Sequence, residues 1–227
     1  MKQLTLLFSV GMLLCLFSCA PAKEGPKAED MNLANPYKAM MVRHSVSSYD
    51  TFKTVFNSKD SLRSAAAMEV LAYGRGIDEP NTIIVLSKLG DLQKAKDLAA
   101  SPALKDAMMK STATGAPTID FMTVIRDDTS KISTMDRIMV SHHVKDFDAW
   151  LKVYDAEGKA KRAENGLVDR GMGRGIDDPN MVYLLFAVTD AAKAKARSES
   201  EELKKLMTDG GVDSAPAFFS FKWDVMN

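Results

Sequence analysis

Beyond its first nineteen residues, the 227-residue sequence contains no cysteine, because its two cysteines are Cys15 and Cys19. The rest of the chain can form no internal disulfide and offers no thiol nucleophile. Basic and acidic residues balance at 30 each, so long-range attraction to nucleic acid is not expected. The chain also lacks a Gly-X-Ser-X-Gly motif and a compact group of metal-binding side chains. These absences argue against a disulfide scaffold, a nucleic-acid-binding protein and a common serine hydrolase, and they predict no bound metal or cofactor.

The N-terminus carries the pattern of an export signal. Lys2 precedes an almost wholly apolar segment, residues 4–17, which is too short and wrongly flanked for a membrane-spanning helix. Residues 16–19 read Leu-Phe-Ser-Cys, which resembles the lipobox of bacterial lipoproteins. The resemblance implies a signal peptide at residues 1–18, cleavage before Cys19, and acylation of that cysteine with chains such as palmitate. The alternative is an ordinary secretory signal that happens to contain a cysteine.

Residues 19–37 combine prolines and a glycine with many charged residues. Such a stretch has too little apolar surface to bury and predicts a flexible tether. Acyl chains on Cys19 would hold the protein at a membrane through several hydrocarbon chains, which together bind stably. Ala20 stands where an aspartate would resemble an inner-membrane retention signal of enteric bacteria. We therefore expect a lipid-anchored protein of the cell envelope, in the outer membrane of a Gram-negative bacterium.

Most of the chain consists of two copies of one sequence. Gly-Arg-Gly-Ile-Asp-Glu-Pro-Asn at residues 74–81 returns as Gly-Arg-Gly-Ile-Asp-Asp-Pro-Asn at residues 173–180, an offset of 99. Upstream of this segment the offset is 98. Agreement this ordered predicts an internal repeat, with a first copy at residues 38–126, a linker at 127–136 and a second copy at 137–227.

Each copy has the pattern strand, helix, strand, strand, helix, strand. In the second copy, Asp146 and Asp190 are suited to cap the two helices, the second of which should run to about Met207. In the first copy Asp91 stands in the place of Asp190. Alternating or continuous apolar runs predict the strands of the second copy at residues 137–144, 167–174, 181–188 and 217–225. This order is the split βαβ arrangement of ferredoxin-like folds, so we expect an α+β fold built from two βαββαβ repeats.

Two such repeats can cover each other. Four strands with both helices on one face leave the other face bare, and two bare apolar faces can pack sheet against sheet. We therefore predict that the two ferredoxin-like repeats form an intramolecular, pseudo-dimeric α+β barrel, in which the repeat itself supplies the interface.

Two motifs in each copy resemble a known group. His-X-Val-X-X-Phe/Tyr-Asp is followed by Asp-Asp/Glu-Pro-Asn before an apolar strand, and then by an aspartate that opens a helix. This pattern resembles dimeric α+β barrel proteins similar to antibiotic-biosynthesis monooxygenases, and the resemblance covers nearly all of residues 39–225. It implies the fold more than a function, because the group includes cofactor-free oxygenases, haem-degrading enzymes, cyclases and muconolactone-isomerase-like proteins.

His44 and His142 occupy equivalent positions near the ends of the first predicted strands. A histidine on an apolar strand face is usually a satisfied core residue. The alternative is that both line a cavity and act as a catalytic base or bind a metal or haem iron. Haem proteins resembling this group usually use one histidine in one half, so the doubled histidine favours a shared structural role.

The repeated turn segment supplies Arg75 and Arg174. Its proline and asparagine suit a hairpin turn and its glycines suit turn backbone angles, so a structural turn is the first interpretation. The second interpretation places both arginines at the barrel mouth, where their planar guanidinium groups hold an anionic ligand. Tyr73 and Trp150 either fill the core or line the ligand space between the sheets.

The function favoured by the sequence is a lipid-anchored envelope protein that binds a small, mostly apolar ligand between its two sheets, with no catalysis established. A second hypothesis is a cofactor-independent oxygenase or isomerase that uses His44 or His142 as a base and Arg75 or Arg174 to hold an enolate. A third is a structural or interaction module of the envelope, which a large exposed apolar patch would favour.

Overall fold

A computed structural model describes residues 32–227 of the chain. The expected signal peptide, Cys19 and most of the expected tether lie outside these residues. The first strand begins at Asn32, inside the stretch expected to be tether. No helix in residues 32–227 combines the length and the apolarity needed to cross a bilayer.

Both repeats have the predicted order of strands and helical segments. The first repeat consists of β1 (Asn32–Ser45), α1 (Tyr49–Ser58), α2 (Asp60–Ala65), β2 (Met68–Gly76), β3 (Thr82–Leu89), α3 (Leu92–Ala99), α4 (Pro102–Lys110) and β4 (Thr118–Asp127). The second consists of β5 (Asp136–His143), α5 (Phe147–Glu157), α6 (Lys159–Glu164), β6 (Leu167–Gly175), β7 (Met181–Val188), α7 (Ala191–Glu199), α8 (Glu201–Asp209) and β8 (Ala217–Met226).

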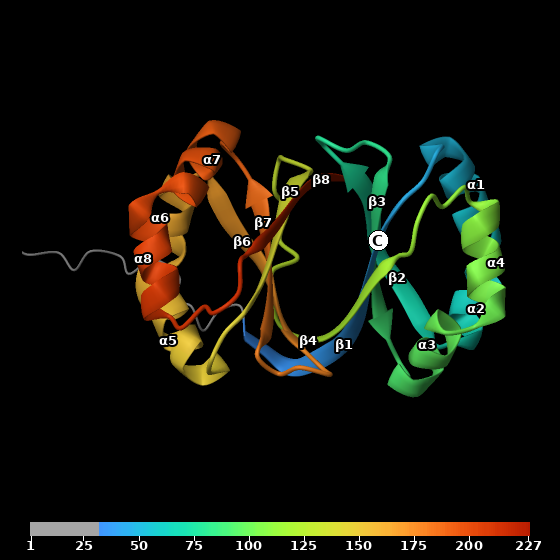
Figure 1. The fold of residues 1–227 in the computed structure, drawn as a ribbon, viewed down its shortest axis with the longest axis horizontal. Helices are drawn as coiled ribbons and strands as arrows, with labels where there is room; N and C mark the ends of the chain where they lie inside the picture. The colour runs from blue at the N-terminus through green and yellow to red at the C-terminus, as the bar shows by residue number, and fades with distance from the viewer. Residues whose placement is uncertain (1–31) are drawn as a thin grey trace, which may run out of the picture.

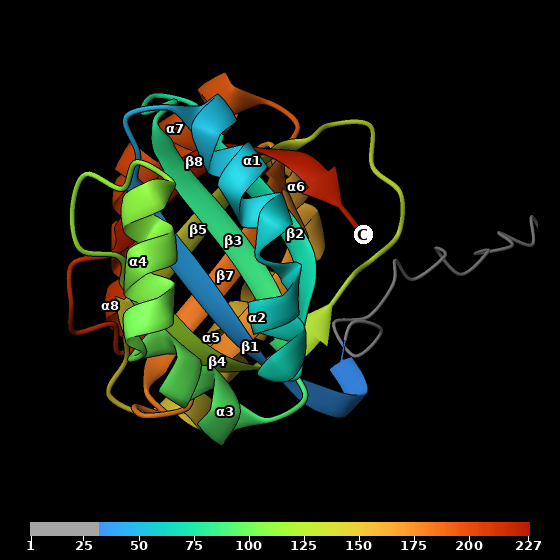
Figure 2. The ribbon, with the colours of Figure 1, turned by 90° about the vertical axis from the view of Figure 1, so that its right-hand side faces the viewer.

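The two four-stranded sheets close into one barrel. Within the repeats the strand orders are β4-β1-β3-β2 and β6-β7-β5-β8, with antiparallel neighbours, and the sheets join through β2·β8 and β4·β6. Figure 1 shows the barrel in the middle, with α1–α4 on one side and α5–α8 on the other. Figure 2 shows the helices of the first repeat lying across the outer face of their sheet. The intramolecular pseudo-dimeric α+β barrel predicted from the repeat is confirmed.

The expected helix caps are present. The side chains of Asp91, Asp146 and Asp190 each accept a hydrogen bond from the backbone amide three residues later. Such a bond satisfies one of the amides that a helix N-terminus leaves without an intrahelical partner. In the first repeat Ser48 caps α1 in the same way, through the Thr51 amide.

Each helix expected from the sequence is divided into two. The helix expected from Asp190 to about Met207 is interrupted at Ser200, whose extended backbone (ψ 142°) ends α7 and whose hydroxyl caps α8. Ser101 has the same role in the first repeat, where Pro102 also prevents continuation of α3. Between α5 and α6 the break is at Gly158, which has a φ of 80°.

The repeated glycine-arginine segment lies at the joins between the sheets. A Cβ atom on Gly74 would overlap the backbone of Lys222 on β8, and one on Gly173 would lie 2.6 Å from the Met122 sulfur on β4. The segment then turns between two strands, β2 to β3 and β6 to β7, as the structural interpretation predicted. The close approach of the two repeats therefore requires a glycine at position 74, where the overlap is with backbone, and favours one at position 173.

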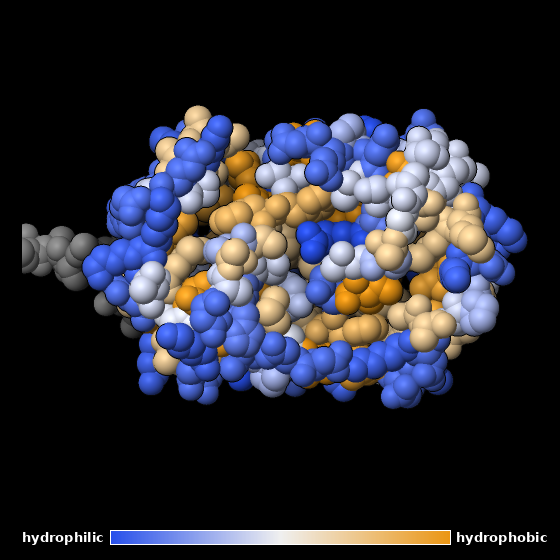
Figure 3. All heavy atoms as spheres, in the orientation of Figure 1, coloured by the Kyte–Doolittle hydropathy of each residue, from blue (hydrophilic) through white to orange (hydrophobic). Residues whose placement is uncertain are grey.

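Apolar side chains on the two faces of the strands form different parts of the core. One cluster combines residues of both repeats, including Met41, Met139, Phe221 and Trp223, and fills the barrel interior. The other clusters lie between each sheet and its own helices. Figure 3 shows hydrophilic residues around the rim of the molecule and hydrophobic residues farther in, beside the helices and across the barrel in the middle.

Candidate functional site

A cavity lies between the helices and the sheet of each repeat. The cavity of the second repeat has a volume of about 100 Å³ and that of the first about 90 Å³. Their lining residues correspond through the 98- and 99-residue offsets, for example Val55 with Val153 and Met108 with Met207. The sequence placed the ligand space between the two sheets, whereas these cavities lie outside the barrel, under the helices.

His142 and Trp150, both proposed as site residues, meet in the cavity of the second repeat. The two rings are edge to face with centroids 5.6 Å apart. His142 is buried, and neither of its ring nitrogens has a hydrogen-bond partner within residues 32–227. Burial lowers the pKa of His142 to about 4, so its imidazole is neutral at neutral pH. A buried polar group without a partner is costly and needs a physical explanation.

His44 has the equivalent position in the cavity of the first repeat. Its ring is edge to face with Phe52, at 6.2 Å between centroids, and burial lowers its pKa as well. Its Nδ1 is buried without a partner among the described residues. The two histidines therefore occupy equivalent positions in the structure, one beneath the helices of each repeat.

Arg75 and Arg174 do not line these cavities. Each guanidinium stacks on the first residue of a helix, Arg75 on Tyr49 at 4.8 Å and Arg174 on Phe147 at 4.3 Å. Arg174 Nε also donates a hydrogen bond of 2.5 Å to the Pro179 carbonyl. The arginines therefore pack against the first residues of α1 and α5, and they do not line the cavity that contains the histidine of their repeat. Their role as holders of an anionic ligand stays a prediction.

Tyr73 packs in the helix-facing core of the first repeat. Its ring is edge to face with Phe52 and with Phe56, at 6.3 and 5.3 Å between centroids. It is buried and does not line the cavity of its repeat. The core interpretation therefore describes Tyr73, whereas Trp150 lines a cavity.

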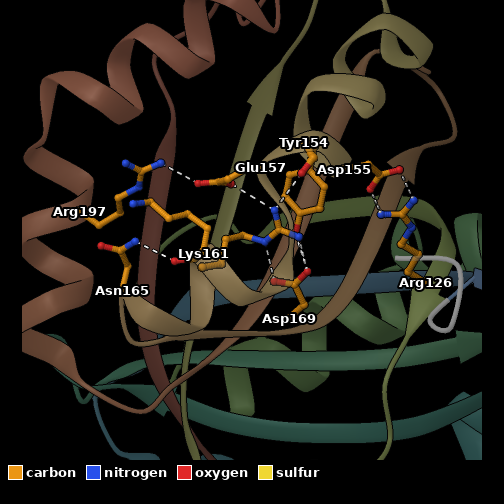
Figure 4. Close-up of polar contacts among 9 residues, drawn as sticks. Arg126, Tyr154, Asp155, Glu157, Lys161, Asn165, Asp169 and Arg197 are labelled. Atoms are coloured by element: carbon orange, nitrogen blue, oxygen red, sulfur yellow. Dashed lines mark hydrogen bonds and ion pairs between the residues drawn. The ribbon is translucent and has the colours of Figure 1, made fainter. Parts of the chain in front are cut away.

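A buried ionic network lies beside the second cavity, and the sequence did not single it out. Arg162 donates to Asp169 through Nε at 2.8 Å and Nη2 at 2.7 Å, and through Nη1 to Glu157 at 3.1 Å (Figure 4). Arg197 Nη2 donates to the other oxygen of Glu157 at 2.6 Å. Tyr154 donates to Asp169 at 3.2 Å, and burial together with that carboxylate raises its pKa well above the usual value. Arg162, Glu157 and Arg197 all line the cavity.

The first repeat lacks this network. The positions of Tyr154, Asp169 and Arg197 are taken there by Phe56, Val70 and Leu98. Arg63 corresponds to Arg162, and it donates to the Phe56 carbonyl as Arg162 does to that of Tyr154. The signal was present in the sequence as differences between the two copies, because these three positions are apolar in the first copy and polar in the second.

Comparison with models of known protein families and with curated protein sequences finds no match. Among solved structures, the chain is similar to an anthrone oxidase-like protein, with 11% identity over 87% of this chain and 95% of that one, and a TM-score of 0.56. A proposed monooxygenase from Fusobacterium nucleatum has 10% identity over 86% and 95%, with a TM-score of 0.54. Another from Lactobacillus acidophilus has 14% identity over 84% and 95%, with a TM-score of 0.50.

The chain has the dimeric α+β barrel fold, built within one polypeptide. Its structural neighbours are the monooxygenase-like proteins that the sequence motifs resemble. At identities of 10–14% the similarity describes the barrel and not its activity.

The chemistry that this barrel offers is limited to a few polar groups in an apolar space. His142 is neutral and can accept or donate one hydrogen bond through each ring nitrogen. Within residues 32–227 no group of three His, Cys, Asp or Glu side chains is placed to hold a metal ion. The arrangement suits recognition of an apolar molecule with one hydrogen-bonding group, or proton transfer to and from such a molecule.

Proposed function

We propose that the barrel binds a small, mostly apolar molecule with one hydrogen-bonding group in the cavity of the second repeat. The observation that carries this proposal is the unpartnered imidazole of His142, buried at the edge of Trp150 in an apolar cavity. A ligand hydroxyl or carbonyl there would supply the missing hydrogen bond and remove the cost of burying an unpaired polar group. An apolar cavity of roughly 150 Å³ in another protein holds benzene, so a cavity of about 100 Å³ suits one small ring or a short alkyl chain.

The test compares phenol with toluene, which differ in one hydroxyl group. Isothermal titration of the purified chain should show saturable binding of both, with phenol tighter by about tenfold, the effect of one net hydrogen bond. In His142→Phe the preference for phenol should disappear while toluene still binds. His44→Phe, in the first repeat, is the matched control for the second-repeat site and should leave most of the preference. The absence of saturable binding, or a phenol preference that survives His142→Phe, contradicts the proposal.

We further propose that this binding takes place in the cell envelope, on a protein held by acyl chains at Cys19. The lipobox-like residues 16–19 and the polar stretch that follows support this location. An apolar cavity on a membrane-anchored protein suits capture of an apolar molecule that is sparingly soluble in water.

A second function, a cofactor-independent oxygenase or isomerase, is favoured by the same neutral His142. A base with a pKa lowered to about 4 is unprotonated at neutral pH and can accept a proton from an enolisable substrate. The fold neighbours described as an anthrone oxidase-like protein and as monooxygenases are compatible with it. Its test is deuterium exchange into cyclohexanone in heavy water, followed by NMR. If the protein accelerates the exchange and His142→Phe does not, catalysis by His142 is supported. An exchange rate equal to that in buffer alone contradicts this function.

The third hypothesis, an interaction module, has less support. The large hydrophobic residues that are exposed in the described part of the chain are Ile77, Met109, Phe218 and Met226. They belong to a turn, to α4 and to both ends of β8. Single exposed apolar residues are normal on protein surfaces.

A further inference from the structure

An open groove lies on the outer surface of the second repeat, beside the cavity. It has a volume of about 650 Å³ and is lined by residues of α5, α6, α7 and α8. Its charged lining residues are four bases and three acids: Lys152, Lys161, Arg197, Lys205, Glu157, Glu202 and Asp209.

The groove and the cavity share part of their walls. Val153, Glu157, Arg197 and Leu206 line both spaces. The apolar cavity and the charged groove are therefore adjacent, with these four side chains in the wall between them. A molecule that extends between Val153 and Leu206 would have an apolar body in the cavity and a polar end in the groove.

Two cations of the groove are free or weakly paired. Lys152 forms no ion pair with any residue in 32–227. Lys161 lies 3.8 Å from Glu202, a long separation for an ion pair, and the Glu202 side chain is 65% exposed. Figure 4 shows Lys161 reaching toward Arg197, whose own partners are Glu157 and Glu202. An anionic group that displaced exposed Glu202 would meet Lys161 and Arg197 together.

The first repeat does not offer this set of cations. The positions of Lys152, Lys161, Arg197 and Lys205 are held there by Thr54, Leu62, Leu98 and Asp106. Many lining residues of the two cavities correspond, whereas these four basic residues occur in the second repeat alone.

We infer that the cavity and the groove of the second repeat form one site for a small amphiphilic anion, with the apolar body in the cavity and the anionic head beside Lys152 and Lys161. This inference rests on the proposed binding function and names its ligand class. The lysines act as point charges and select the sign of the head group, while burial of the body supplies most of the affinity.

The experiment uses three probes of equal chain length, hexanoate, hexan-1-ol and hexylamine, titrated calorimetrically into the full chain at low ionic strength. Hexanoate should bind about tenfold tighter than hexan-1-ol, and hexylamine weaker than both. Lys152→Ala and Lys161→Ala should each weaken hexanoate about threefold, as expected for one exposed charge pair, and leave hexan-1-ol unchanged. Lys204→Ala is the matched control, because Lys204 is an exposed lysine of α8 that pairs with Glu201 and does not line the groove. Added salt at 0.5 M should remove the advantage of hexanoate.

The outcomes separate this inference from the function on which it rests. If hexanoate and hexan-1-ol bind equally, or if Lys204→Ala weakens hexanoate as much as Lys152→Ala does, the charged half of the site is refuted while cavity binding stands. If no probe binds, or if binding is unaffected by Trp150→Phe in the cavity wall, both proposals fail.

Discussion

Arg162 holds Asp169 with two parallel hydrogen bonds, 2.8 Å from Nε and 2.7 Å from Nη2, and both side chains are at least nine-tenths buried. This pair ties α6 to β6 beside the second cavity. Bidentate arginine–carboxylate contacts are among the strongest polar contacts in proteins. Replacing one partner of such a pair destabilises the protein strongly, because the charge of the other partner stays buried without its counter-ion.

Asp169→Val should therefore destabilise the chain by about 3–5 kcal/mol, since it leaves Arg162 with one fewer carboxylate in a buried position. Valine is the residue that the first repeat has at this place, Val70. The double variant Arg162→Met/Asp169→Val removes both charges and should recover most of the loss. Urea unfolding at neutral pH gives the free energy of unfolding of the native chain, the single variant and the double variant. If the double variant is no more stable than Asp169→Val, the loss of stability does not come from the buried charge of Arg162 left without its partner, and the prediction is wrong.

Stability should fall as the pH is lowered from about 6.5 to about 4. Burial lowers the pKa of His142 to about 4, whereas an unfolded histidine has a pKa of about 6.5. Between these values the unfolded chain binds a proton that the folded chain does not, so the contribution of neutral His142 is complete above pH 6.5 and is lost on acidification. The loss is up to about 3 kcal/mol.

In His142→Phe this part of the pH dependence should disappear from unfolding free energies measured between pH 4 and 8. His44 has a pKa lowered in the same direction, so a smaller slope should remain. His143 is the contrasting control. Its hydrogen bond to Asp213 raises its pKa, so its contribution is present at low pH and is lost as the pH rises. A His143→Asn variant that flattened the acid slope would contradict the assignment to His142.

Gly74→Ala should destabilise the barrel by about 3 kcal/mol, the upper end of the usual cost of overpacking, because its Cβ would overlap the Lys222 backbone where β2 joins β8. Gly115→Ala is the matched control, since a Cβ there meets no atom within 4 Å. The thermal midpoints of the two variants should differ clearly. Equal midpoints would mean that the join between the repeats is loose enough to absorb a methyl group.

Cys19→Ser should release the protein from membranes. Acylation at Cys19 is the basis of the proposed anchoring, and serine offers no thiol for it. Metabolic labelling with an alkyne-bearing palmitate, followed by membrane fractionation, should show label and protein together in the membrane fraction of the native chain only. Cys15→Ser is the control and should keep both. Labelling that persists in Cys19→Ser would refute the lipid anchor.

Much of this barrel could be predicted from the sequence because the chain repeats itself. The offset between copies showed that both halves have one pattern, and the apolar runs within a copy predicted the order of its elements. Asp91, Asp146 and Asp190 marked helix starts through a local hydrogen bond that depends on nearby residues alone. The helix breaks at Ser101 and Ser200 were not predicted, although each has a serine at an N-cap position and Pro102 follows Ser101.

The position of the site could not be predicted in the same way. Alternation shows that Val42 and His44 share one face of β1, while Met41 belongs to the other, but both faces are apolar. Nothing local distinguishes the face that lines the barrel from the face under the helices, since that depends on how two distant sheets close. The ionic network could not be predicted for a similar reason. Its charged residues lie on four different elements, and nothing in the local sequence shows that the fold brings them together: Glu157, Arg162, Asp169 and Arg197.

The covalent connection between the two halves has a consequence for how the sites can differ. In a homodimer of this shape, every substitution would occur in both subunits, so a buried arginine–glutamate pair in one cavity would have to be tolerated in the other. A single polypeptide is free of that constraint. The first repeat can keep apolar side chains at three positions where the second repeat has polar ones, namely Phe56, Val70 and Leu98. Two related cavities can then serve different chemistry in one molecule.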